Sequence, residues 1–566
     1  MADAMRRVLF LQLPLLDNDT SAAHEDVMLA GQYLAHALRS AGETAFYDSC
    51  FLPAEADGLG DAALMDAVRR LDPAVIAFTL YLWNVERAIY LARRLRRDLP
   101  RARFIAGGPE AAWSHPFLFR SRVFDAVVVG EGETVFPPIL RHWRGGGPAP
   151  SYAAVAWRQE RGYAWGSRPA PAVDLRRALP PPQEGTRQPG TGGVGYLETT
   201  RGCPMRCAFC RYHHLRQGVQ HLDAREALTR VERMAEAGVR EIRLIDPTFN
   251  ANPCFDAILQ GLVAMNRGRE LKFFAELQAD RVTPRQAVRL ARAGFAELEA
   301  GVQSTDAAVL KAIRRPTDAG KLEQGLRALT GEGIRVTVDV LYGLPFQTRK
   351  DVWESIRWAQ RFRGSRVQCM QTLLLPGTDL RRRARRWGMA AARLPPYGVT
   401  STPWLPREHI AEIERRLYES DRLPADTQTP RFVGRRLEGM FEELAPAGGT
   451  SGKIGQRNRR ALVFEAEDLF GQRETISAAI RRALTEEPHA LWQFILAPHT
   501  QEPLDLLDGL IKTIRGAPRL VSDRWAGALL SGRVASRRLF VRLPPGRRLA
   551  ASWVRAAEDV LRTAFY

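Results

Sequence analysis

The sequence of 566 residues is poor in cysteine, lysine and long apolar runs. Its six cysteines are too few for the disulfide framework of a secreted scaffold. No run of about eighteen uncharged apolar residues occurs, so no membrane span and no membrane partner are predicted. The apolar segment near the amino terminus, residues 8–13, is too short for a secretory signal peptide. We therefore expect a cytoplasmic protein.

The positive charge is almost entirely arginine, because only six of the 82 basic residues are lysines and 76 are arginines. A formal net charge of +19 raises the question of a nucleic-acid partner, since clustered basic side chains neutralise phosphates. The arginines are scattered along helical segments, which is more typical of a G- and C-rich genome than of a binding surface. The run at residues 381–386 is interpreted first as a solvated helix face and second as an anion site. The composition therefore argues against nucleic acid, although RNA modification stays open.

Half of the cysteines form one motif, in which Cys203, Cys207 and Cys210 have the spacing C-x3-C-x2-C. Thiolates at this spacing can hold three corners of a cubane iron–sulfur cluster and leave the fourth iron without a cysteine. An iron with an open position can bind a small molecule directly. A structural zinc site is the alternative, because His213 and His214 lie close enough in sequence to complete a set of four ligands.

The surroundings of this motif favour the cluster. Aromatic Phe209 directly precedes the third cysteine, a strand-like segment at residues 194–199 precedes the motif, and a long helical pattern follows it. The arrangement resembles the signature loop of the radical S-adenosylmethionine (SAM) enzymes, C-x3-C-x-aromatic-C after the first strand of a partial barrel. The resemblance implies a [4Fe-4S] cluster on the three cysteines, with SAM at the open iron.

An alternation of strands and helices continues from residue 194 to about residue 378, and predicts six parallel strands in an open barrel with its site at their carboxyl ends. The predicted strands are residues 195–199, 241–245, 272–278, 297–303, 335–341 and 368–375. In the resembled family the second strand end lies near the SAM amino group, the third and fourth near its ribose and carboxylate, and the Gly-x-Pro segment near adenine. The implied SAM contacts are Phe209, Asp246, Thr248, Asn250, Glu276, Gln278, Gln303 and Leu344. Individually, the polar members also fit helix caps or turns.

The first 145 residues form another alternating region, with strand-like runs at residues 8–13, 45–47, 74–82, 103–106 and 126–129. Continuous apolar strands between amphipathic helices predict a parallel sheet covered on both faces, which binds ligands at the carboxyl ends of its strands. Three loops at those ends resemble the cobalamin-binding domain that precedes the radical SAM barrel in a large group of enzymes. The implied cobalamin contacts are Thr79, Leu80, Tyr81, Trp83, Asn84, Gly107, Gly108, Pro109, Gly130, Glu131, Gly132 and Glu133. The Asp-x-His-x-x-Gly loop that supplies a cobalt ligand in other cobalamin proteins does not follow the first strand, so we expect no imidazole from the protein on cobalt.

These patterns predict an α/β protein with a Rossmann-like, doubly wound cobalamin-binding domain at residues 1–145. A linker rich in proline and glycine at residues 146–193 and a partial (β/α)6 radical SAM barrel at residues 194–378 follow. Residues 379–566 are expected to form a small α+β domain over the substrate, with Tyr397 near the substrate.

The resemblance implies an enzyme, a class B cobalamin-dependent radical SAM methyltransferase. It would transfer a methyl group from SAM through methylcobalamin to a carbon of a small-molecule or peptide precursor in natural-product biosynthesis. An electron donor such as flavodoxin or ferredoxin is the implied partner. Two alternatives stay open: an oxidative cyclase or ring-rearranging enzyme with the same two domains, and a cobalamin or redox sensor. The sequence identifies neither a catalytic general base nor the substrate.

Overall fold

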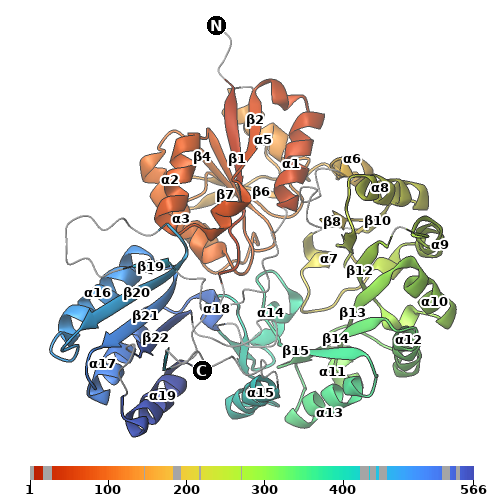
Figure 1. Cartoon of the computed structure of the whole chain (residues 1–566). Helices are drawn as coiled ribbons and strands as arrows, with labels where there is room; N and C mark the ends of the chain where they lie inside the picture. Colours follow the sequence, from red (N-terminus) through yellow and green to blue (C-terminus); the bar gives the residue numbers. More distant parts are fainter. Residues whose placement is uncertain are drawn as a thin grey trace.

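The structure is a computed structural model, and it describes residues 5–16, 28–145, 147–182, 193–215, 218–268, 270–420, 432–433, 442–444, 456–524, 536–543 and 549–565. Three larger sheets organise these residues, one in each third of the chain (Figure 1). Among the helices described, none has both the length and the apolar character needed to cross a membrane.

The first domain is built on a seven-stranded sheet in the order β2-β1-β3-β4-β5-β6-β7. Its first five strands are parallel, and their side chains alternate between two cores. Val8 and Phe10 pack with helices α1 and α5, whereas Leu9 and Leu11 pack with α2 and α3. The predicted doubly wound fold is confirmed. The elements are β1 (Arg6–Leu11), α1 (Leu29–Ser40), β2 (Tyr47–Phe51), α2 (Asp61–Leu71), β3 (Val75–Thr79), α3 (Val85–Asp98), β4 (Arg103–Gly107), α4 (Leu118–Ser121), β5 (Ala126–Val128) and α5 (Phe136–Trp143).

The predicted linker is divided between its neighbours. Strands β6 (Val155–Arg158) and β7 (Tyr163–Trp165) extend the first sheet in antiparallel pairing. Helix α6 (Leu175–Ala178) instead packs through Leu175 into the core of the barrel. A few apolar side chains on short elements are enough to dock these segments, and such short patterns are hard to distinguish from loop in the sequence.

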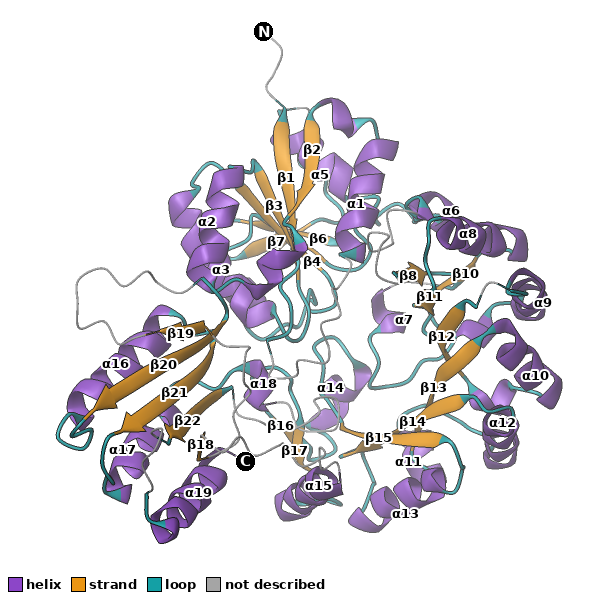
Figure 2. Cartoon of the chain, in the orientation of Figure 1, coloured by secondary structure: helices purple, strands orange, loops and turns teal. Residues whose placement is uncertain are grey.

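The second domain is an open barrel of six parallel strands in the order β15-β14-β13-β12-β11-β8. Helices cover its outer face (Figure 2). Ala275 and Leu277 on β12 face this helical core, so Phe274 and Glu276 between them face the interior of the barrel. The six predicted strands are confirmed. The strands are β8 (Val194–Leu197), β11 (Glu241–Leu244), β12 (Lys272–Leu277), β13 (Phe295–Gln303), β14 (Arg335–Tyr342) and β15 (Ser365–Gln371), and the main helices are α8 (Ala224–Glu236), α9 (Phe255–Met265), α10 (Pro284–Ala293), α11 (Ala307–Ala312), α12 (Ala319–Gly331) and α13 (Arg349–Gln360).

The barrel unit continues beyond its predicted end at residue 378. Leu380, Val399 and Ile410 share one buried cluster with Val340 of β14 and Cys369 of β15. The segment therefore belongs to the barrel rather than to the carboxyl-terminal domain. Its elements are α14 (Asp379–Ala384), β16 (Ala390–Ala391), β17 (Val399–Ser401) and α15 (Arg407–Ser420).

The carboxyl-terminal domain has a sheet in the order β18-β22-β21-β20-β19, and its last four strands along the chain are parallel. It is therefore mainly α/β, and the predicted α+β arrangement is wrong. Every residue of β21 is buried, as expected for a central strand that is covered on both faces. The elements are β18 (Phe432–Val433), β19 (Glu442–Leu444), β20 (Arg459–Ala466), α16 (Arg473–Glu486), β21 (Leu491–Pro498), α17 (Leu504–Arg515), α18 (Val521–Arg524), β22 (Arg537–Arg542) and α19 (Ala551–Phe565).

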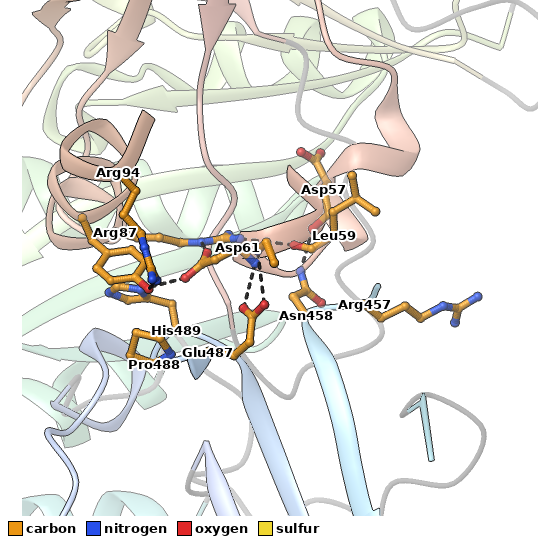
Figure 3. Close-up of polar contacts among 12 residues, drawn as sticks. Asp57, Leu59, Asp61, Arg87, Arg94, Arg457, Asn458, Glu487, Pro488 and His489 are labelled. Atoms are coloured by element: carbon orange, nitrogen blue, oxygen red, sulfur yellow. Dashed lines mark hydrogen bonds and ion pairs between the residues drawn. The ribbon is translucent and has the colours of Figure 1, made fainter. Parts of the chain in front are cut away.

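A buried charged junction joins the first domain to the carboxyl-terminal domain (Figure 3). The carboxylate of Glu487 accepts hydrogen bonds from the backbone N–H groups of Asp61 (2.9 Å) and Ala62 (3.2 Å) at the start of α2. Asp61 in turn accepts from Arg87 Nε at 2.8 Å and lies 3.1 Å from His489 Nδ1. Burial opposes the ionisation of Asp61, but the charges of Arg87 and His489 hold its pKa well below the usual range.

We expect Asp61→Asn to destabilise this junction by about 3 kcal/mol, because it leaves the buried guanidinium of Arg87 without its counter-charge. The measurements are the thermal unfolding midpoint and the rate of proteolytic cleavage between the two domains. Asp66→Asn on the same helix is the matched control, since the Asp66 side chain is 56% exposed and its ion pair with Arg69 should contribute less than about 1 kcal/mol. Equal effects of the two substitutions would contradict the role of Asp61.

Candidate functional site

The loop of the three cysteines is held on both sides by backbone hydrogen bonds. Ala208 N donates to Ile313 O after α11 at 2.8 Å, and Ala208 O accepts from Leu380 N in α14 at 2.7 Å. Cys207 is buried, and Cys203 and Cys210 are partly buried. The loop therefore has a fixed path between two elements of the barrel unit.

Two polar groups of the barrel accompany the thiols. Thr248 Oγ1 after β11 lies 3.7 Å from Cys203 Sγ, and Arg315 Nη1 donates to Cys207 Sγ at 3.5 Å. Burial raises the pKa of the Cys210 thiol to about 11, so a thiolate there needs a positive centre beside it. Cluster irons would supply such a centre. Phe209 and Leu344, two predicted SAM contacts, pack into one apolar group beside this loop.

The loop does not resemble a closed site for a single ion. In the described part of the chain, no three His, Cys, Asp or Glu side chains converge on one metal-ion position. A cubane instead spaces its thiolates around four irons. The side chain of His214, one of the two histidines considered for zinc, lies outside the described residues.

A cavity of about 320 Å³ opens at the carboxyl end of the first sheet and reaches the cysteine loop. On the barrel side it is lined by Gly202, which directly precedes Cys203, and by Ile245 and Pro247 at the end of β11. A ligand in this cavity would therefore lie between the two domains. Seven predicted cobalamin contacts line it: Thr79, Gly107, Gly108, Gly130, Glu131, Gly132 and Glu133.

The remaining predicted cobalamin contacts shape the loop after β3. The Asn84 amide donates to Thr79 O at 3.1 Å and accepts from Tyr81 N at 2.8 Å. The rings of Tyr81 and Trp83 stack with centroids 4.4 Å apart. Leu80 and Pro109 belong to the two loops that meet beside the cavity. For these five residues, contact with cobalamin stays a prediction.

Gly108 is the position at which a side chain would separate these loops. Its φ is +99°, and a Cβ there would lie 2.7 Å from Leu80 O and 2.9 Å from Leu80 N. Glycine therefore allows the loop after β4 to press against the loop after β3, so that both backbones line the cavity.

Arg201 links the cavity to the cysteine loop, and the sequence analysis missed it. Its guanidinium donates to Glu198 Oε2 at 2.7 Å and to Glu133 Oε1 at 2.6 Å, and it approaches Glu131 at 3.4 Å. Tyr33 of α1 donates to Glu198 at 3.0 Å. One cation thus holds carboxylates from both domains beside Cys203, and its position next to the Gly-Cys pair was the available signal.

Two of the predicted SAM contacts form hydrogen bonds to other residues of the barrel. Both carboxylate oxygens of Asp246 accept from Thr199, one of them from its backbone N at 2.7 Å, and the residue is 1% exposed. The Asn250 amide is likewise paired with the backbone N and O of Gln278. Contacts of these two side chains with SAM are therefore not supported by the geometry. Both instead position the ends of neighbouring strands.

Two glutamines at the same strand ends fit a bound ligand better. Within the described residues, Gln278 Oε1 and Gln303 Oε1 are buried and have no hydrogen-bond partner. A buried acceptor without a donor costs about 1–3 kcal/mol, which a ligand that supplies N–H or O–H groups would recover. SAM offers such groups on its amine and ribose.

Three carboxylates line the interior of the barrel on adjacent strands. Glu276 of β12 pairs in register with Glu299 of β13, and Asp339 of β14 hydrogen bonds to Glu299. Gln368 of β15 donates to Asp339 at 3.2 Å. Although Glu276 is open to the interior, surrounding protein and the charge of Glu299 raise its pKa to about 7. Burial and Glu299 also raise the pKa of Asp339 well above its ordinary value.

The first domain and the barrel unit also meet in a buried hydrogen-bonded triad. Tyr397 OH donates to Glu110 Oε2 at 2.9 Å, and His115 Nε2 lies 3.0 Å from the same oxygen. His115 Nδ1 accepts from Leu118 N at 3.0 Å, so Nε2 carries the proton and donates to Glu110. Arg211, next to Cys210, donates to Ala111 O at 3.3 Å. Tyr397 is therefore a domain contact, and its predicted approach to the substrate is not supported.

The fold and the site together define an enzyme with a three-cysteine cluster loop beside a cavity that two domains line. The comparisons agree: residues 197–359 match the radical SAM superfamily and residues 24–140 match the B12 binding domain. The chain thus contains a radical SAM domain and a B12-binding domain. Its cofactors are a [4Fe-4S] cluster, SAM and cobalamin.

Two curated relatives are similar to about half of the chain. A 2-(S-pantetheinyl)-carbapenam-3-carboxylate methyltransferase of Streptantibioticus cattleyicolor is 29% identical over 52% of the chain and 46% of its own length. An anaerobic magnesium-protoporphyrin IX monomethyl ester cyclase of Cereibacter sphaeroides is 23% identical over 58% of the chain and 55% of its own length. The chain thus spans about half of these curated relatives.

A solved structure extends the similarity to the fold. The cobalamin-dependent SAM radical enzyme OxsB, with aqua-cobalamin and SAM bound, superposes with a TM-score of 0.58 at 15% identity. The match covers 74% of this chain and 67% of OxsB. At this identity the comparison supports the arrangement of the domains rather than a common substrate.

Replacement of Cys203, Cys207 or Cys210 by alanine should abolish incorporation of the cluster, because each removes one of its three thiolates. Iron content and visible absorbance after anaerobic reconstitution measure the effect. Cys254→Ala is the control, since this half-buried cysteine lies before α9 and outside the motif. Retention of a full cluster in any of the three motif variants would contradict the assignment.

Asp339→Asn should flatten the dependence of stability on pH. Because folding raises the pKa of Asp339, the folded chain binds more protons than the unfolded chain as pH rises above 3.8, and the free energy of unfolding falls. Asparagine does not titrate. Between about pH 4 and pH 8, the free energy of unfolding of the variant should therefore fall by about 1 kcal/mol or more less than that of the wild type. Urea titrations at several pH values test this, with exposed Asp508→Asn as the control.

Proposed function

We propose that this enzyme transfers a methyl group from SAM, through cobalamin, to a carbon of a small-molecule or peptide precursor in natural-product biosynthesis. The observation that carries the proposal is the shared cavity of about 320 Å³. Loops of the B12-binding domain form one wall, and Arg201 and Gly202, directly before the first cluster cysteine, form part of the other. A methyl donor bound there would face the interior of the barrel.

The residues present fit the cofactors. Cys203, Cys207 and Cys210 would hold the cluster, and the buried acceptors of Gln278 and Gln303 would bind donor groups of SAM. When bound, the cluster and SAM would supply one-electron cleavage of a carbon–sulfur bond, and cobalamin would supply a transferable methyl group. The carboxylates of Glu131 and Glu133 would accept hydrogen bonds from the amide side chains of the corrin ring.

The carboxylates inside the barrel could accept a proton from the substrate or donate one to it. Glu276, whose pKa is about 7, can hold or release a proton near neutral pH. Asp339, whose pKa is also raised, hydrogen bonds to Glu299 and keeps a proton in the interior. When Glu276 is ionised it only accepts hydrogen bonds, so it favours a substrate that presents N–H groups or a positive charge to the barrel.

The relatives support methyl transfer, and one of them also supports the cyclase alternative. One similar protein is named a carbapenam methyltransferase, whereas another is named a protoporphyrin ester cyclase. The buried oxygens of Gln278 and Gln303, which have no hydrogen-bond partner among the described residues, favour catalysis over the sensor alternative because they offer a binding site for SAM. The shared cavity supports transfer, because loops of the B12-binding domain line it together with the residues directly before Cys203.

The decisive experiment is an anaerobic assay of the enzyme reconstituted with cluster and cobalamin, with SAM that carries a deuterated methyl group. Mass spectrometry follows the substrate, S-adenosylhomocysteine and 5′-deoxyadenosine together. Methyl transfer predicts a product that carries the deuterated methyl group, with formation of S-adenosylhomocysteine that stops when cobalamin is omitted. The ratio of the two SAM products distinguishes radical from polar transfer.

The same assay can also contradict the proposed methyl transfer. Turnover of a substrate to a product of unchanged carbon count, with 5′-deoxyadenosine and no S-adenosylhomocysteine, would replace methyl transfer by cyclisation or rearrangement. The Cys203→Ala variant is the control for reactions that do not depend on the cluster.

A further inference from the structure

The outer surface beside the cluster loop carries a concentration of exposed arginines. Helix α14 begins where Leu380 N donates to Ala208 O at 2.7 Å, between Cys207 and Cys210. Leu380 and Ala384, one turn apart, pack against Ala208 in one buried cluster. The helix is therefore attached to the cluster loop through its apolar side.

Its other side is basic and open to solvent. Arg382 and Arg383 lie between the two buried positions of α14, and Arg385 and Arg386 follow the helix. All four are exposed. Asp379, the acidic residue of α14, is 8% exposed and forms ion pairs with Arg314 and Arg382, so it contributes little negative charge to the surface.

Neighbouring elements add to the same charge. Arg206, between Cys203 and Cys207, is exposed. On the other side of Ala208, Lys311 of α11 is exposed two residues before Ile313, whose carbonyl accepts from Ala208 N. Basic residues thus occupy the cluster loop itself and both elements that hold it.

We propose that this surface, which we call the α14 basic face (Arg206, Lys311, Arg382, Arg383, Arg385 and Arg386), is the docking site of an acidic one-electron carrier protein. The inference rests on the proposed function, in which the cluster must be reduced before each carbon–sulfur cleavage. One electron would leave the reduced carrier and enter the cluster, while no bond or proton moves. Positive charge at this position would hold an acidic carrier beside the loop that carries the three cluster cysteines.

Charge is the suitable means of recognition for such a partner. Complexes of electron carriers are small and transient, with interfaces below about 1,200 Å². Exposed charges at a rim change association rates and salt dependence more than they change the lifetime of a complex. Exposed arginines on a rigid helix that is bonded to the cluster loop provide steering without a deep pocket.

The test uses the full-length enzyme with its cluster, and reduced flavodoxin as the probe. We expect Arg383→Glu/Arg386→Glu to lower the rate of cluster reduction by flavodoxin about tenfold at low ionic strength, because it reverses the local charge that steers association. Visible bleaching and electron paramagnetic resonance of the cluster report the reduction. Binding of flavodoxin, measured by biolayer interferometry, should weaken in parallel. At about 1 M salt, where the screening length is about 3 Å, the difference should disappear.

Two further variants act as controls. Arg481→Glu/Arg482→Glu on α16 makes the same change in net charge on exposed residues of the carboxyl-terminal domain, and should leave reduction by flavodoxin unchanged. Arg383→Lys/Arg386→Lys keeps the charge and should retain most of the rate. Dithionite needs no docking surface and should reduce the cluster of all variants equally.

Each deviation from this pattern has a defined meaning. Equal loss in the α16 control, unchanged reduction of the α14 variant, or failure of flavodoxin to reduce the wild-type cluster would each overturn the docking site. Slower reduction by dithionite would assign the arginines to the integrity of the cluster loop and would also overturn it. If dithionite reduces the wild-type cluster but no methylated product forms, the proposed function fails while the docking result still stands.

Discussion

The arrangement of the two candidate cofactor sites depends on one partly buried arginine. Arg201 lies two residues before the first cluster cysteine and bridges Glu198 of the barrel with Glu131 and Glu133 of the B12-binding domain. Burial opposes the charge of Arg201, but hydrogen bonding to Glu198 and the charge of Glu133 raise its pKa further. Removal of such a cation would leave carboxylates uncompensated within the cavity wall, which costs several kcal/mol. Electrostatic attraction therefore holds the loops that line the cavity beside the cysteine loop.

The other domain contacts follow the same principle. The B12-binding domain meets the barrel exit through Glu110, His115 and Tyr397, and Arg524 of α18 contacts both Glu86 of α3 and Pro395 O. Apolar contacts would permit sliding, because their attraction is not directional. Buried hydrogen bonds and ion pairs require one geometry, and an unpaired member is costly. A reaction that passes a group between two cofactors needs such a fixed geometry.

The cluster motif, the glycine-rich loops and the barrel strands could be predicted because each is encoded by a short stretch of sequence. The three cysteines, the glycine-rich loops and the six barrel strands each depend on neighbouring residues. The six strands form as expected, and residues of the glycine-rich loops line the cavity that reaches the cysteine loop. The partners of Asp246 and Tyr397 could not be found in this way. Asp246 meets Thr199, 47 residues away, and Tyr397 meets Glu110, 287 residues away. Contacts at such separations depend on the tertiary fold, and no local propensity encodes them.

The same limit explains why the predicted domain boundaries differ from the structure. Strands β6 and β7 and helix α14 are short, and each is stabilised by a neighbouring core rather than by its own pattern. Helices of one or two turns are not stable alone in water, because nucleation costs more than a few hydrogen bonds return. Their place is decided by the cores against which they pack.

Part of the backbone strain lies near the open end of the barrel. Gln303, Phe346 and Tyr397 are non-glycine residues with φ of +70°, +65° and +62°. They lie at the end of β13, after β14 and at the barrel exit, and each costs of the order of 1 kcal/mol. Tyr397 is held by its hydrogen bond to Glu110, and the Phe346 ring packs 4.4 Å from that of Trp404. Side-chain contacts thus maintain the unfavourable backbone beside the open end of the barrel, and the strand ends that would hold SAM are positioned before any ligand arrives.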